Sequence, residues 1–158
     1  MRERQPKRKA RPSRTPQSND VIARLQEILL NAVLGGLPLP GSNKPVSLPD
    51  LSFVFSQSSV VLADSNLAGP LSITASPKPV QVLSLDQILE NARSERDVTY
   101  LEIQPAEISN DTVGLTLKAQ IIPHDPAQRT LGLSSIRVKF RKVGDEWQIG
   151  EDPVFSAS

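Results

Sequence analysis

The chain has 158 residues, with 18 Lys or Arg, 17 Asp or Glu and no cysteine. This length accommodates one domain, and the absence of cysteine excludes disulfide bonds and thiolate chemistry. The longest apolar stretch, ILLNAVLGGLPLP, is interrupted by Asn31 and Pro38, so it is shorter than the roughly 20 residues that a membrane span needs. We therefore expect a soluble protein without a transmembrane segment, and we favour an intracellular over a secreted location.

Charge is distributed unevenly along the chain. Residues 1–18 carry seven cations against one acid, Glu3, which gives +6, whereas the remaining 11 cations and 16 acids give −5. With few apolar residues, this segment cannot offset its ordering entropy, so we expect a disordered basic tail. Such a tail favours an anionic partner, and nucleic acid is the first candidate. Its cations are Arg2, Arg4, Lys7, Arg8, Lys9, Arg11 and Arg14.

Residues 19–155 are expected to form a single domain that opens with a helix over residues 20–34. Its apolar residues recur at helical spacing, with Arg24, Gln26, Glu27 and Asn31 on the opposite side. Pro38, Pro40, Pro45 and Pro49 then punctuate a connector over residues 35–50. The apolar residues are Val21, Ile22, Leu25, Ile28, Leu29, Ala32 and Val33.

Strands and one short helix are predicted for residues 51–155. The stretches LSFVFSQSSVVLA and GPLSITA are rich in β-branched and aromatic residues, which favours two strands. In VLSLDQILENARSE, Ser84 and Gln87 have the spacing of a capping box, and Leu83 and Ile88 that of a hydrophobic staple. This pattern predicts a short helix that ends near Arg96.

The last third of the chain alternates between apolar and polar residues, as a half-buried strand does. The alternation runs through TYLEIQ, TVGLTLKAQII and SSIRVKFRKV, with turn residues at Asn110-Asp111 and Gly144-Asp145. We therefore predict an α+β fold in which a curved antiparallel sheet of about four to six strands is backed by one or two helices.

The ending Gly144-Asp145-Glu146-Trp147-Gln148-Ile149 follows a long predicted hairpin. Residues 80–150 thereby resemble nuclear-transport-factor-like and cystatin-like domains, in which a curved antiparallel sheet finishes in a tight turn and a Trp strand. The resemblance implies a cone-shaped α+β fold. The acid and base pairs of that family's enzymes have no matched positions here, so it implies no catalytic residue.

The sequence predicts no catalytic residue, metal site or cofactor. His124 is the only histidine and lies between Pro123 and Pro126 in a predicted loop, without a nucleophile or second ligand nearby. The paired acids Asp145-Glu146 and Glu151-Asp152 flank Trp147 at a turn and near the C-terminus, where solvation is expected.

Arg137, Lys139 and Arg141 are predicted to share one face of a strand, about 7 Å apart, which suits a track of phosphates. The alternative is a solvated face, kept charged against association of sheets. Our first hypothesis is a non-catalytic binding or assembly module that uses the tail and this face. A coat-like nucleic-acid-packaging protein, and a small pocket enzyme or ligand carrier near Tyr100, His124 or Trp147, are the alternatives. A protein partner or a homodimer remains open.

Overall fold

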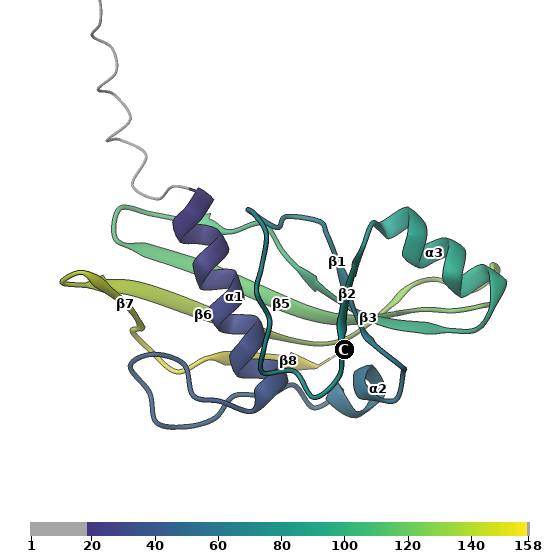
Figure 1. The fold of residues 1–158 in the computed structure, drawn as a ribbon, viewed down its shortest axis with the longest axis horizontal. Helices are drawn as coiled ribbons and strands as arrows, with labels where there is room; N and C mark the ends of the chain where they lie inside the picture. Colours follow the sequence, from purple (N-terminus) through teal and green to yellow (C-terminus); the bar gives the residue numbers. More distant parts are fainter. Residues whose placement is uncertain (1–18, 158) are drawn as a thin grey trace, which may run out of the picture.

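The computed structural model describes residues 19–157, which form an α+β fold built on one mostly antiparallel sheet (Figure 1). The predicted basic tail, residues 1–18, lies outside the described residues. The helices are α1 (Asn19–Gly35), α2 (Leu51–Phe55) and α3 (Leu85–Ser94). The strands are β1 (Val60–Ala63), β2 (Val80–Leu83), β3 (Val98–Ile103), β4 (Glu107–Ile108), β5 (Thr112–Ile122), β6 (Leu131–Val143), β7 (Glu146–Ile149) and β8 (Val154–Ala157).

The described part of the chain has eight strands and three helices, more than the four to six strands and one or two helices predicted. The sheet order is β2-β1-β3-β5-β6-β7, while β4 pairs with β5 and β8 pairs with β6. Only the two pairings of β1, with β2 and with β3, are parallel. The predicted number of strands was too low because β2, β4, β7 and β8 have two to four residues, too few to show a clear alternation.

Helix α1 lies across one face of the sheet and confirms the helix predicted for residues 20–34. Its apolar side packs against the side chains that β5 and β6 direct to this face, in one continuous core. Figure 1 shows α1 crossing β5 and β6. Because burying these side chains removes apolar surface from water, this face supplies most of the hydrophobic stabilisation of the fold.

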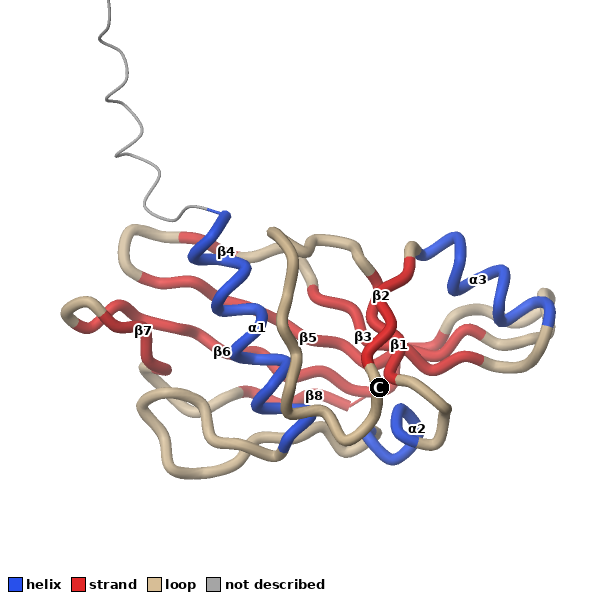
Figure 2. Tube along the Cα trace, viewed as in Figure 1, coloured by secondary structure: helices blue, strands red, loops and turns tan. Residues whose placement is uncertain are grey.

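The strand predicted for GPLSITA is wrong. Residues 69–75 contain no strand, and the segment runs alongside α1 as an extended strap (Figure 2). We call residues 64–76 the α1 strap. The buried Gln26 side chain donates to the Asn66 carbonyl (2.9 Å) and accepts from the Ala68 N–H (3.0 Å), and Asn31 accepts from two further strap amides. Side chains of the helix thus satisfy the backbone groups that a sheet would otherwise pair.

The strand predicted over LSFVFSQSSVVLA divides into a helical turn and a strand. Residues 51–55 form α2, which begins where the Asp50 carbonyl accepts from the Phe53 and Val54 N–H groups, and only VVLA forms a strand, β1. The β propensity of this stretch is overridden because Val54 enters the core from a helical turn. Gln57 then exchanges two hydrogen bonds of 2.8 Å with the Thr99 backbone.

Helix α3 confirms the predicted short helix and its capping box. The Ser84 hydroxyl accepts from the Gln87 N–H (3.1 Å), while the Gln87 side chain accepts from the Ser84 N–H (2.9 Å). Its apolar side packs on the face of the sheet opposite α1, which we call the outer face. Together with residues of β1, β3 and β5 it forms a second, smaller core cluster, in which Tyr100 is only 4% exposed.

The long hairpin of β5 and β6 follows the predicted alternation up to one irregularity. The inward residues of β5 and β6 are fully buried through Ala119, where the register with β6 shifts. Beyond this point Ile121 is half-buried, whereas Ile122 reaches the second cluster. Gly144 takes the positive φ, +64°, that the tight turn between β6 and β7 requires.

Candidate functional site

Strand β6 places the predicted cations Arg137, Lys139 and Arg141 on the outer face, where all three are exposed. The residues between them, Val138 and Phe140, point to the α1 side and are fully buried. Strict alternation along a strand therefore fixes the three cations on one side of the sheet. The tail cations named above lie outside the described residues.

Arg137 forms an ion pair with Glu107, which comes from β4 on the far side of β5. The two side chains meet above Gly114, because a Cβ atom at Gly114 would lie 3.0 Å from Glu107 Oε1. The side chains remain 51% and 65% exposed. The sequence did not predict this pair, since Glu107 and Arg137 are 30 residues apart.

Lys139 has a carboxylate partner from the opposite flank of β6. Its Nζ lies 3.9 Å from Glu151 Oε1, and the two side chains are 44% and 67% exposed. The Gly150 N–H donates to the Lys139 carbonyl (3.2 Å), which brings the segment after β7 alongside β6. A Cβ atom at Gly150 would lie 3.6 Å from Arg141 Nε, so the Arg141 side chain passes over this glycine.

The three cations face small residues on the neighbouring strand β5. In register, Arg141 lies opposite Thr112, Lys139 opposite Gly114 and Arg137 opposite Thr116. The side chains next to the cations therefore project less from the sheet than the cations do. Two of these residues carry hydroxyl groups that could hydrogen-bond an anion. Arg137, Lys139 and Arg141 are exposed, and the apolar cluster under α3 contains no residue of β6.

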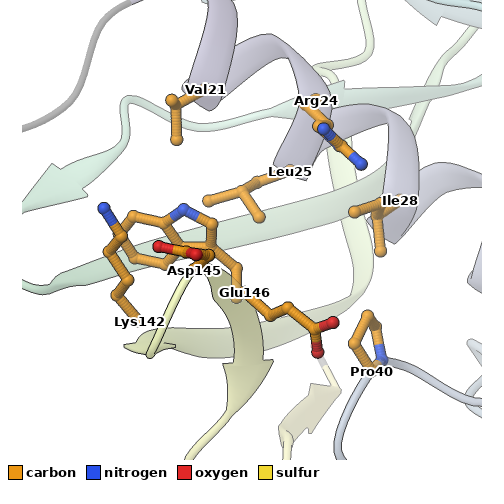
Figure 3. Close-up of a pocket in the computed structure, with 9 residues that line it drawn as sticks. Val21, Arg24, Leu25, Ile28, Pro40, Lys142, Asp145 and Glu146 are labelled. Carbon is orange, nitrogen blue, oxygen red and sulfur yellow. The ribbon is translucent and has the colours of Figure 1, made fainter.

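A recess of about 440 Å³ opens on the other side of the sheet, between α1 and the hairpin of β6 and β7 (Figure 3). Its walls are apolar where Leu25 and Ile28 of α1 approach the hairpin. Arg24, Lys142, Asp145, Glu146 and Trp147 also line it. A volume of this size suits a small ligand. The ligand-carrier alternative placed a cavity near Tyr100, His124 or Trp147, and of these three residues Trp147 alone lines the recess.

His124 contacts a backbone carbonyl of α3 and a carboxylate that follows this helix. Its Nδ1 lies 2.7 Å from the Ala92 carbonyl oxygen, and its N–H donates to Asp97 Oδ1 (2.6 Å). The ring therefore anchors the loop after β5 to the helix. Burial, with Glu102 nearby, raises the pKa of Tyr100 to about 12. Both residues lie on the outer side of the sheet, whereas the recess beside Trp147 opens on the α1 side.

Residues 19–157 contain no group of three or more His, Asp or Glu side chains that could hold a metal ion. In the same part of the chain, no helix has the length and apolar character needed to cross a membrane. No protein-family profile, curated protein or solved structure matches the chain.

Proposed function

We propose that the protein is a non-catalytic binding module for a polyanion, with nucleic acid as the first candidate. Its contacts would be the basic segment of residues 1–18 and the outer-face cations Arg137, Lys139 and Arg141. The observation that carries the proposal is the placement of three exposed cations along one strand, on a part of the sheet that no described helix covers.

The ion pairs on this face are compatible with the proposal. Pairs between exposed side chains contribute only about 0–1 kcal/mol to stability. A phosphate chain can therefore replace Glu107 and Glu151 at little cost to the fold. Counterion release from the nucleic acid favours the exchange at low salt. The +6 charge of residues 1–18 would add a sequence-independent contribution to the same binding.

The test is a salt series of binding to labelled single-stranded and double-stranded nucleic acid, with three full-length proteins. One is unchanged, one has Gln at the seven cations of residues 1–18, and one has Gln at positions 137, 139 and 141. We expect the unchanged protein to bind at about 50 mM salt with a steep negative dependence of log K on log salt. Each variant should bind more weakly and with a shallower slope.

The variants separate the contributions of the two surfaces. Loss of binding in the tail variant alone would restrict the function to residues 1–18. If the unchanged protein fails to bind either nucleic acid at about 50 mM salt, where such contacts are strong, the proposal is wrong. Assembly into large oligomers on nucleic acid, followed by light scattering, would favour the coat-like packaging protein.

The recess beside Trp147 supports a second candidate function, a carrier of a small amphipathic ligand. It joins an apolar floor to two cations, Arg24 of α1 and Lys142 of β6, and to two carboxylates, Asp145 and Glu146. Among the described residues, neither cation forms an ion pair. Trp147 is the only tryptophan, so its fluorescence reports directly on occupation of the recess. A saturable change with an apolar carboxylate, abolished by Lys142→Gln, would support this function.

A further inference from the structure

We infer that the carboxylates of Glu107 and Glu151 compete with phosphate groups for the β6 cations. They thereby set the affinity of these cations for a chain of phosphates, the backbone of single-stranded nucleic acid. This inference rests on the proposed function. It adds that the protein discriminates a linear polyanion from a single phosphate ion, because two of the three cations are occupied when no partner is bound.

The two carboxylates approach β6 from opposite flanks. Glu107 reaches Arg137 from β4, across the gap that Gly114 leaves in β5. Glu151 reaches Lys139 from the segment that follows β7. Both carboxylate side chains are about two-thirds exposed, at 65% for Glu107 and 67% for Glu151, so a phosphate chain that follows β6 can displace them into solvent.

Arg141 differs from the other two cations. Among residues 19–157 it forms no ion pair, and its exposed side chain passes over Gly150. Arg141 is therefore available to a first phosphate. Its neighbours become available only when the next phosphates along the same chain exchange with Glu151 and then with Glu107.

The spacing of the cations favours an extended single strand. Alternate residues of a β-strand lie about 7 Å apart, similar to successive phosphates of an extended nucleic-acid strand. The residues beside the cations, Thr112, Gly114 and Thr116, are small, and the space above Gly114 becomes available to a sugar once Glu107 is displaced. Since no exposed aromatic side chain of β5 or β6 lies among the cations, binding should be insensitive to base sequence.

The experiment measures binding of labelled single-stranded DNA and of inorganic phosphate to the full chain and to Glu107→Gln, Glu151→Gln and the double variant. Glu90→Gln is the matched control. Glu90 is exposed on α3, so its substitution removes the same charge at a position away from β6. For single-stranded DNA we expect each single variant to bind up to about fivefold more tightly, the ratio that an exposed ion pair supports. The salt dependence of the double variant should steepen by up to about two phosphate contacts.

The control and the phosphate titration decide the outcome. Glu90→Gln should stay within about twofold of the unchanged protein, since exposed charges beyond a Debye length are screened. If the unchanged protein binds DNA but the double variant binds no more tightly than Glu90→Gln, the inference is overturned while the proposed function stands. Absence of DNA binding by every protein would overturn the proposed function itself. An equal gain for inorganic phosphate and DNA would overturn the discrimination. Unchanged melting temperatures would show that the gain does not come from altered folding.

Discussion

The two faces of the sheet differ in what covers them. The α1 face lies under α1, α2 and the α1 strap, and its side chains form one continuous apolar core. The outer face is covered by α3 over β1 and β3, while its β6 portion carries Arg137, Lys139 and Arg141 in the open. Packing therefore constrains the residues of one face, and leaves those of the other available for binding.

The largest effect on stability is expected for a β6 residue whose side chain lies on the covered face. Phe140 is fully buried in the main core, and its neighbour Arg141 is exposed on the outer face. Phe140→Ala should lower the free energy of unfolding by about 3–5 kcal/mol, because it leaves a cavity. Arg141→Ala should change it by no more than about 0.5 kcal/mol. Denaturant unfolding of both variants checks the contrast, and equal losses would show that the two faces are not distinct.

A smaller effect on stability is expected where the α1 strap packs on the covered face. Gln26→Leu removes both hydrogen bonds from the Gln26 side chain to the α1 strap and leaves the Asn66 carbonyl and the Ala68 N–H without their partner. We expect a loss of about 1–3 kcal/mol in the free energy of unfolding. Hydrogen exchange at the Ala68 amide should accelerate at the same time. Gln128→Leu, at an exposed loop position, is the control and should change neither quantity. Unchanged exchange at Ala68 would contradict the role of Gln26.

The smallest effect is confined to alkaline pH and concerns the part of the outer face under α3. Since the pKa of Tyr100 rises from 10.0 to about 12, the folded protein keeps the phenol proton between these pH values while the unfolded chain loses it. The free energy of unfolding should therefore fall as pH rises through this window and be independent of this group below pH 10. Tyr100→Phe should remove that part of the fall. Tyr100 is the only tyrosine, so phenolate absorbance follows its titration directly, and a midpoint near 10 would contradict burial under α3.

The elements with a long regular pattern were predicted correctly from the sequence. Helix α1, the capping box of α3 and the hairpin of β5 and β6 all follow from residue spacing that acts over one or two turns or a few strand positions. Residues 51–55 and 69–75 were predicted wrongly as strands. Their structure depends on partners distant in sequence, the core around Val54 in one case and the side chains of Gln26 and Asn31 in the other.

Which side chains of β6 share a face follows from the order of the residues, because alternation along a strand is a local property of the backbone. The contrast in charge between residues 1–18 and the rest of the chain follows from it as well. The pairing of Glu107 and Glu151 with two of the three cations depends on the tertiary structure, as does the recess between α1 and the hairpin around Trp147. The order of the strands brings these groups together, and the Glu107 side chain reaches Arg137 by crossing Gly114 of β5. No spacing along the chain encodes such contacts.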